Sequence, residues 1–211
     1  VSWTKISNNL AGNNSMNMAV VEQSSADTNV FYAARYDNKL FRSDNCLSTN
    51  PSWYDLSGYL PSSGTPNDIE THPTDENIVY MTLGTKVYKS VDKGHSWSNI
   101  SGNLPAIQMN TIAFYKNAPE GLYVGTDAGV YYKDQTTTGW IPFSHGLPAN
   151  GEITELEIYY DNDSVSQDAI RASTYGRGLW GSDMYHVAPH ADFTADKTTI
   201  PVGCAVNFAD I

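Results

Sequence analysis

The sequence predicts an all-β fold in which one four-stranded antiparallel unit is repeated about four times. Three observations predict it: a high content of aromatic residues, a tryptophan segment that recurs, and a strand pair that recurs in step with it. Aromatic residues make up 12% of the 211 residues, and the 14 tyrosines and 5 tryptophans favour strands over helices. The repeat is the strongest signal, because such a unit buries its apolar face only by stacking on a neighbour.

The recurring segment has the pattern Trp-x-x-[Ile/Leu/Phe]-Ser. Its four copies begin about 40 to 50 residues apart, at Trp3, Trp53, Trp97 and Trp140. Pairs of apolar strands lie between these copies, at 31–34 and 40–44, 79–82 and 87–90, and 122–125 and 130–134, and one more pair follows the last copy, at 170–173 and 179–183. A further strand is expected before each pair, near 18–22, 69–72, 111–115 and 154–159. Four short strands in each repeat predict the blades of a β-propeller. The alternative, a meandering β-sandwich, does not require a tryptophan segment at the same place in every repeat.

The two ends of the repeat leave two arrangements open. The first tryptophan segment has no blade of its own, and the last unit has three strands with no tryptophan segment after them. Trp3 to Ile6 could complete the last blade and close a four-bladed ring. We favour the alternative, in which the chain is the C-terminal part of a larger propeller whose first blades lie upstream of Val1.

A tight hairpin turn is predicted between the third and fourth strands of one unit, at Ser90-Val91-Asp92-Lys93-Gly94-His95-Ser96-Trp97. Asp92 can accept hydrogen bonds from amides of its own turn, Gly94 can adopt a positive φ, and Trp97 opens the returning strand. In Ser90, Asp92, Gly94, Ser96 and Trp97 the turn resembles an Asp-box, the S-x-D-x-G-x-[ST]-W motif of BNR-type and sortilin-like propellers. The resemblance implies a structural role at the blade rim.

A second unit is expected after the propeller, with the boundary between residues 1–187 and 188–211. The stretches 191–196 and 201–210 resemble the first two strands of a PKD domain, an immunoglobulin-like spacer of cell-surface proteins. Together with the Gly-Arg-Gly-Leu turn at 176–179, this order of units resembles secreted surface proteins of Bacteroidetes-type bacteria, which usually carry a C-terminal domain for type IX secretion. The resemblance implies a secreted or cell-surface location.

Charge and cysteine content exclude several classes of function. Twelve Lys and Arg against 23 Asp and Glu give a net charge of −11, which repels phosphate backbones and anionic lipid heads. Nucleic acid is therefore not an expected partner, and no apolar run is long enough for membrane insertion. Cys46 and Cys204 fall in different expected units, so no disulfide is predicted and their role stays open.

The expected ligand site is the mouth of the central channel, where the innermost strands begin. The residues that align there are Asn17, Asn67, Asn110 and Thr154. Amides and hydroxyls close to aromatic rings suit the hydroxyl groups and the flat apolar face of a sugar. The same side chains could instead solvate the channel and cap the strand starts.

Two classes of enzyme can be examined by residue type. Sialidases clamp a carboxylate with three arginines, but the four arginines of this chain fall at unrelated strand positions. A xyloglucanase-like glycoside hydrolase needs an acid and a base carboxylate on opposite walls of a cleft. Asp68, Glu70 and Glu155 are eligible catalytic carboxylates by type, although no motif of that family surrounds them.

No cofactor is predicted. The acidic stretch 161–168 suggests a structural calcium site at Asp161 and Asp163, but it lacks the glycine and the terminal glutamate of an EF-hand loop. A solvated hairpin loop is the favoured interpretation. His186 and His190 are separated by Pro189, which argues against a helix that would bring them together as metal ligands.

From these observations we expect a non-catalytic extracellular binding or scaffold module. Its expected partners are glycans, other surface proteins, or upstream blades of the same parent chain. The alternative is part of a polysaccharide-degrading glycoside hydrolase with a carboxylate pair at the channel mouth. Two carboxylates about 5 to 10 Å apart across an aromatic-lined cleft would favour the enzyme, and a mouth lined by Asn and Thr would favour binding.

Overall fold

The computed structural model describes residues 17–161 and 167–186 without a break. It also describes residues 2, 3, 5–7 and 10 and two short strands at 193–195 and 208–210. The structure is built from strands, with one turn of 3-10 helix, η1 (Ser57–Tyr59). No helix in this part of the chain has the length and apolarity needed to cross a membrane.

Fifteen of the strands form four antiparallel sheets in chain order, which we call blades A to D. Blade A contains β1 (Met18–Gln23), β2 (Phe31–Arg35), β3 (Lys39–Ser43) and β4 (Tyr54–Asp55). Blade B contains β5 (Asp68–Thr71), β6 (Val79–Leu83), β7 (Lys86–Ser90) and β8 (Ser98–Asn99). Blade C contains β9 (Met109–Tyr115), β10 (Gly121–Thr126), β11 (Gly129–Lys133) and β12 (Ile141–Pro142). Blade D contains β13 (Ile153–Tyr159), β14 (Ala169–Thr174) and β15 (Gly178–Asp183).

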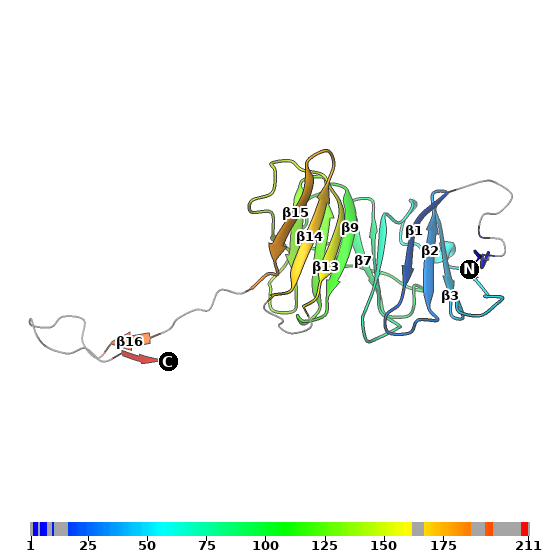
Figure 1. Cartoon of the computed structure of the whole chain (residues 1–211), viewed down its shortest axis with the longest axis horizontal. Helices are drawn as coiled ribbons and strands as arrows, with labels where there is room; N and C mark the ends of the chain where they lie inside the picture. The colour runs from blue at the N-terminus through cyan, green and yellow to red at the C-terminus, as the bar shows by residue number, and fades with distance from the viewer. Residues whose placement is uncertain are drawn as a thin grey trace, which may run out of the picture.

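The four blades stack face to face in a row, with blade A at one end and blade D at the other (Figure 1). Their first strands β1, β5, β9 and β13 lie next to one another in that order, and each blade continues outward from its first strand. This is the arrangement of consecutive β-propeller blades, so the predicted fold class is confirmed. The predicted strand positions agree with the observed strands to within a few residues.

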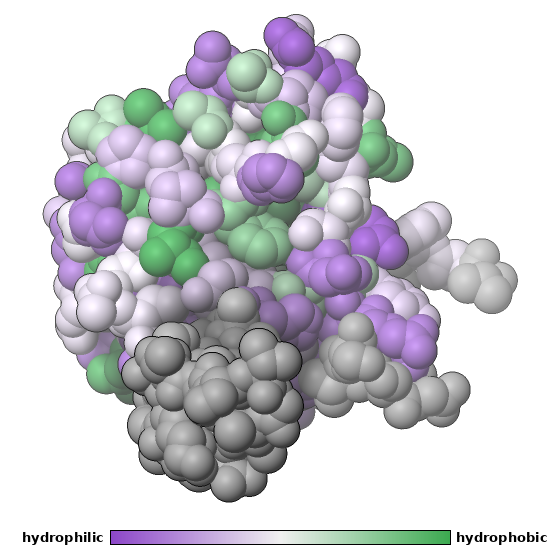
Figure 2. Space-filling model, turned by 90° about the vertical axis from the view of Figure 1, so that its left-hand side faces the viewer, coloured by the Kyte–Doolittle hydropathy of each residue, from purple (hydrophilic) through white to green (hydrophobic). Residues whose placement is uncertain are grey.

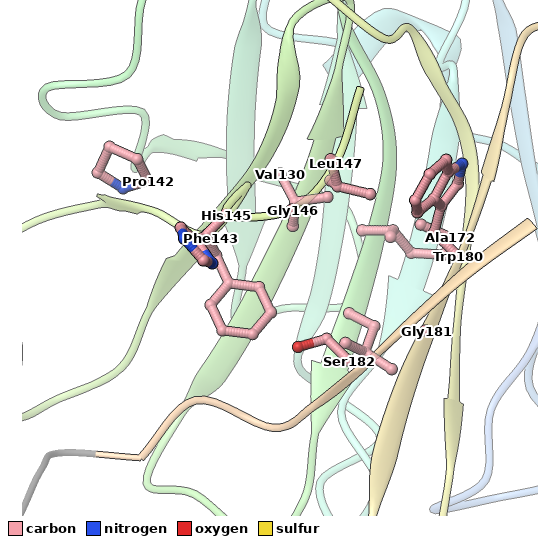
Figure 3. Close-up of a pocket in the computed structure, with 12 residues that line it drawn as sticks. Val130, Pro142, Phe143, His145, Gly146, Leu147, Ala172, Trp180, Gly181 and Ser182 are labelled. Carbon is pink, nitrogen blue, oxygen red and sulfur yellow. The ribbon is translucent and has the colours of Figure 1, made fainter. Parts of the chain in front are cut away.

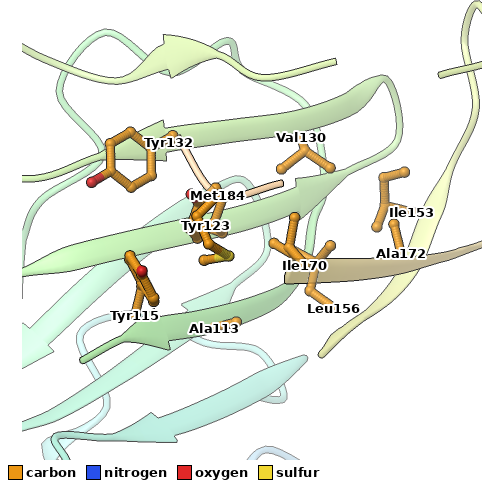
Figure 4. Packing of buried hydrophobic residues seen from close by; sticks show 10 residues of the cluster. All are labelled: Ala113, Tyr115, Tyr123, Val130, Tyr132, Ile153, Leu156, Ile170, Ala172 and Met184. Carbon is orange, nitrogen blue, oxygen red and sulfur yellow. The ribbon is translucent and has the colours of Figure 1, made fainter. Parts of the chain in front are cut away.

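Apolar layers between neighbouring blades form the core. All six residues of β10 are buried, because this strand lies in the middle of blade C with another blade on each side. Between blades C and D, Tyr123, Tyr132, Leu156 and Ile170 belong to one cluster (Figure 4). The Tyr123 hydroxyl is satisfied there by the backbone N–H of Tyr185 at 2.7 Å. Burying one such side chain contributes about 1.5–3 kcal/mol.

The recurring tryptophans pack against the preceding blade. Trp140 is 2% exposed, lies among residues of blades B and C, and donates its indole N–H to the Ile100 carbonyl at 2.9 Å. Trp53 makes the equivalent bond to the Ile6 carbonyl at 3.1 Å. Trp97 packs against blade A, but its indole N–H has no partner among the described residues. The equivalent carbonyl, that of Leu56, instead accepts the N–H of Tyr59 in η1.

The four-bladed ring that Trp3 to Ile6 could close, which is the arrangement not favoured from the sequence, is not formed by the described residues. Blade D has three strands among the described residues, and Ile6 lies at the opposite end of the row, where its carbonyl contacts Trp53 of blade A. Among the described residues the row of four blades is therefore open.

Strands β16 (Phe193–Ala195) and β17 (Phe208–Asp210) pair antiparallel in a separate two-stranded sheet. They fall within the two stretches that resemble a PKD domain. The expected unit boundary at residues 187 and 188, and Cys204, lie outside the described residues. Cys46 is a buried free thiol.

Candidate functional site

The turn around Asp92 binds its own backbone. Asp92 Oδ1 accepts the Ser96 N–H at 2.8 Å and the Ser90 hydroxyl at 2.7 Å, and Oδ2 accepts the Ser96 hydroxyl at 2.6 Å. Gly94 has a φ of 89° and donates its N–H to Ser90 Oγ. Burial opposes ionisation of Asp92, but these hydrogen bonds outweigh it and lower its pKa to about 2. The carboxylate is thus occupied by its own turn.

Blade A carries a variant of this turn in which Asn45 takes the place of the aspartate. Asn45 Oδ1 accepts the Ser52 N–H at 2.8 Å and lies 3.2 Å from the Ser43 hydroxyl. Ser43, Asn45 and Ser52 therefore correspond to Ser90, Asp92 and Ser96, with a longer loop between them. The sequence signal for this correspondence is the serine directly before each tryptophan: Ser52 precedes Trp53 as Ser96 precedes Trp97.

A groove of about 630 Å³ lies between blades A and B where their first strands begin. We call it the mouth groove. Two of the predicted ligand residues, Asn67 and Asn110, line it together with Gln108, Tyr88 and the exposed ring of Tyr36. The groove also has hydroxyl groups along its wall, from Ser62, Ser63, Thr65 and Thr85. It combines a flat aromatic surface with amide and hydroxyl groups.

The amide nitrogens of the two asparagines hold neighbouring blades together. Asn67 Nδ2 donates to the Met109 carbonyl at 2.7 Å, and Asn110 Nδ2 donates to the Ile153 carbonyl at 3.0 Å. Each bond runs from the start of one first strand to the next blade. The Oδ1 atoms of both asparagines accept no hydrogen bond from the described residues, so they remain free as acceptors.

The other two predicted ligand residues do not line this groove. Asn17 contacts its edge through its backbone, because its carbonyl accepts the N–H of Tyr36 at 3.2 Å. Thr154 lies in blade D, where its hydroxyl pairs with that of Ser173 at 2.6 Å. Tyr36 was not predicted as a ligand residue, because it lies in the hairpin turn that follows β2 and not at the start of a first strand.

The second candidate surface is the wall formed by the first strands of all four blades, which we call the acidic wall. A hollow of about 490 Å³ lies against it. Five carboxylates contribute to it: Glu22, Asp68, Glu70, Glu155 and Glu157. The three weak catalytic candidates of the sequence analysis, Asp68, Glu70 and Glu155, are therefore brought onto one surface.

Thr111 of β9 joins two of these carboxylates across three strands. Its Oγ1 lies 2.8 Å from Asp68 Oδ2 and 3.1 Å from Glu155 Oε1. Asp68 Oδ2 also accepts the Ile112 N–H at 2.8 Å. A hydroxyl donates only one proton, so Thr111 can satisfy one carboxylate while a protonated partner donates to it.

Burial makes these acids hard to ionise. It raises the pKa of Asp68 to about 6, with a further contribution from Glu155, and raises the pKa of Glu22 to about 7. Burial and the negative charges of Glu22 and Asp68 hold the pKa of Glu70 well above its ordinary value. The wall therefore carries protons that an exposed acidic surface would lose.

This geometry differs from that of a glycosidase pair. Asp68 and Glu155 extend from the same wall and share one hydroxyl, whereas hydrolysis needs carboxylates that flank the bond to be broken. Among the described residues, the wall by itself offers no opposite carboxylate.

The suggested calcium loop is described only at its ends. Asp168 is buried and accepts hydrogen bonds from Tyr115, Asn117 and the backbone of Asp161. Asp163 lies outside the described residues. Within the part of the chain that is described, no group of three or more His, Cys, Asp or Glu side chains is placed to hold a metal ion.

The arrangement of the sheets places the chain in the class of β-propellers. Similar folds occur in the solved structures of two GH74 enzymes. The Niastella koreensis GH74 enzyme aligns with a TM-score of 0.55 and 10% identity over 74% of this chain and 26% of its own. An ancestral GH74 enzyme aligns with a TM-score of 0.57 and 14% identity over 84% of this chain and 29% of its own.

This chain thus spans less than a third of the length of either enzyme. At such low identity the similarity shows the fold alone. No protein-family model matches the sequence, and no curated protein matches it.

Proposed function

We propose that the chain is part of an extracellular, non-catalytic β-propeller that binds glycans in the mouth groove. One observation carries the proposal: the groove places the exposed ring of Tyr36 beside two asparagines whose Oδ1 atoms are free. Sugars need this combination, because their C–H face stacks on an aromatic ring while their hydroxyl groups exchange hydrogen bonds with amides. Sugars in a polysaccharide and sugars attached to a surface protein both have these features.

Charge narrows the class of sugar. The net charge of −11 and the nearby acidic wall disfavour sulfated or carboxylated sugars. Lys86 is the one cationic side chain on the described lining of the groove. A neutral hexose or pentose polymer is therefore the proposed ligand class.

The remaining parts of the proposal rest on sequence resemblance. We assign the Ser90–Trp97 turn to the Asp-box class, residues 188–211 to the start of a PKD-like domain, and the parent protein to a secreted or surface location. The hydrogen bonds of Asp92 support the first assignment, and the pairing of β16 with β17 supports the second. We further propose that the chain belongs to a larger propeller, which agrees with the share of the GH74 structures that it covers.

The alternative function is part of a polysaccharide hydrolase. The raised pKa of Asp68 supports it, since a general acid must hold its proton near neutral pH. In that case Asp68 would be the acid, and Glu155 the candidate base.

A glycan array followed by titration calorimetry tests the proposal. We expect Tyr36→Ala to weaken binding about 5- to 30-fold, equivalent to about 1–2 kcal/mol, because it removes the stacking surface. Tyr175→Ala is the matched control, since Tyr175 is also an exposed tyrosine but lies in the blade D turn, outside the groove. Equal losses for both variants, or no glycan bound, would refute the site.

Incubating the protein with the glycan that it binds distinguishes binding from hydrolysis. Binding without release of reducing ends supports the non-catalytic proposal. Release that disappears in Asp68→Asn and in Glu155→Gln would establish the hydrolase instead.

A further inference from the structure

The two asparagines of the mouth groove directly precede residues of the first strands that form the acidic wall. Asn67 is followed by Asp68, the first residue of β5, and Asn110 is followed by Thr111 in β9. Asn67 and Asn110 line the groove, whereas Asp68 lines the hollow against the wall. A movement of either strand at this point therefore changes the groove and the wall together.

Asn110 is a bulged residue of β9. The ladder between β9 and β10 skips it and resumes at Thr111, which pairs with Gly125. A β-bulge interrupts the ladder locally and re-aims a side chain, and bulges are common beside functional sites. The Nδ2 atom of Asn110 donates to the Ile153 carbonyl at 3.0 Å and to Asp127 Oδ1 at 3.1 Å. Because no partner in β10 fixes Asn110, its position follows that of Thr111.

Thr111 lies inside the stack of blades and joins three first strands. It is 1% exposed, and β9 packs between β5 and β13. Its Oγ1 is within hydrogen-bond distance of Asp68 Oδ2 and Glu155 Oε1, and it accepts the Leu156 N–H at 3.3 Å. These contacts lie away from the surface of interspersed polar and apolar residues that blade D presents at its end of the row (Figure 2).

The two carboxylates need one proton besides that of the Thr111 hydroxyl. The hydroxyl supplies a single proton for two acceptors, so a proton on Asp68 or on Glu155 completes both hydrogen bonds. When both carboxylates are ionised, one of the two contacts has no proton, and two negative charges face each other across the hydroxyl. Burial favours the protonated arrangement, since it raises the pKa of Asp68 to about 6.

The charged groups around this bridge oppose its ionisation. Strand β6, which pairs with Asp68, has no charged residue. The charged residues that line the hollow beside Asp68 are Glu22 of β1, Glu70 of β5, Lys116 directly after β9, and Glu155 and Glu157 of β13. The ammonium group of Lys116 lies over the ring of Tyr160, beyond the end of β9 that is far from Thr111. Negative charge therefore predominates around Asp68, which disfavours a further ionised carboxylate.

Histidine is the usual source of pH dependence near neutrality, but no histidine lines the mouth groove or the hollow among the described residues. His145 lines a separate hollow of about 300 Å³ between blades C and D, whose other lining residues are uncharged (Figure 3). His72 lies beyond the other end of β5, where its Nδ1 accepts the N–H groups of Thr74 and Asp75. A response of the groove to pH thus points to the carboxylates bridged by Thr111.

We propose that one proton shared by Asp68, Thr111 and Glu155 controls glycan binding in the mouth groove. The proposal rests on the proposed function of the groove and adds its regulation. With the proton bound, the bridge holds β5, β9 and β13 together, and the Oδ1 atoms of Asn67 and Asn110 face the glycan. When the proton leaves, the bridge opens, the two asparagines move and the affinity falls. Glycan binding and proton binding then strengthen each other by the same factor.

The coupling between bridge and groove can be tested without a glycan. In protein that contains isotope-labelled asparagine, the side-chain amide signals of Asn67 and Asn110 should shift between about pH 5 and about pH 8 with a common midpoint. Thr111→Val removes the hydroxyl and keeps nearly the same shape, so it should abolish this shared transition, whereas Thr111→Ser should retain it. Thr71→Val is the matched control. Thr71 is also buried and its hydroxyl binds Glu22 at 2.9 Å, but it bonds a single carboxylate at the other end of β5.

Titration calorimetry with the neutral oligosaccharide selected by the glycan array tests the effect on binding. The affinity of the unmodified protein should fall by about fivefold or more from about pH 5 to about pH 8, with net uptake of protons on binding near the midpoint. Thr111→Val should bind with the same weaker affinity at both pH values, while Thr71→Val should keep the pH dependence.

The two measurements distinguish failure of the regulation from failure of the proposed function. An affinity that is the same at both pH values, or amide signals of Asn67 and Asn110 that do not titrate together, would overturn the regulation by a shared proton. If no oligosaccharide binds while the two amide signals still titrate together, the proposed function is refuted and the shared proton is upheld.

Discussion

Replacing Trp140 with alanine removes the indole that fills the layer between blades B and C. Trp140 is 2% exposed, and burial of about 200 Å² of aromatic surface at about 25 cal/mol per Å² gives about 5 kcal/mol. The Ile100 carbonyl also loses its hydrogen-bond donor. Large-to-small changes of this kind in cores cost about 3–5 kcal/mol. We therefore expect Trp140→Ala to lower the free energy of unfolding by about that amount.

Urea denaturation followed by far-UV circular dichroism measures this effect. Trp140→Phe is the conservative control, because it refills most of the layer and loses only the indole bond. Trp53 and Trp97 are partly exposed, so their replacement by alanine should lower the free energy of unfolding by less. Replacing the exposed Trp3 should not change it measurably. A loss for Trp3→Ala as large as that for Trp140→Ala would refute the reasoning that the tryptophans stabilise the fold by filling layers between blades.

Three further predictions follow from the site geometry. Asp92→Ala should destabilise the protein by about 1–2 kcal/mol, as loss of a capping carboxylate does. Since the pKa of Asp92 falls from 3.8 to about 2 on folding, the stability from its ionised form is lost as pH falls through that range. The pH dependence has the opposite direction for Asp68, because its pKa rises from 3.8 to about 6 on folding. The protonated form of Asp68 stabilises the protein at low pH, and this stabilisation is lost as pH rises through that range. In urea denaturation at several pH values, Asp68→Asn should weaken the change of the free energy of unfolding with pH. An unchanged pH dependence would contradict the raised pKa of Asp68. Gly125→Ala should cost about 1–3 kcal/mol, because the added Cβ would meet Ile153 and Thr111 at 2.6 Å, while Gly58→Ala meets nothing within 4 Å and serves as the control.

The repeat allowed the blades to be predicted because its signals are local. Each tryptophan segment marks a fourth strand, and the strand pairs between the segments have ordinary hairpin spacing. The arrangement of the two ends of the repeat does not follow from local sequence signals. Whether Trp3 to Ile6 closes a ring depends on the angle between successive blades, and no residue of the repeat reports that angle.

The candidate sites were predictable only in part for the same reason. Asn67 and Asn110 were identified from their alignment at strand starts, but their bonds to Met109 and Ile153 cross between blades. Thr111 carries no motif, and it joins Asp68 to Glu155 only because β9 lies between β5 and β13. Such contacts follow from stacking, which sequence spacing does not encode.

The most direct test of the proposed function is an NMR titration of tyrosine-labelled protein with the neutral oligosaccharide selected by the array. Ring signals of Tyr36 and Tyr88 in the mouth groove should shift on binding, while Tyr160 beside the acidic wall should not. Shifts confined to Tyr160 would contradict the account, because the sugar would then lie against the carboxylates of the acidic wall.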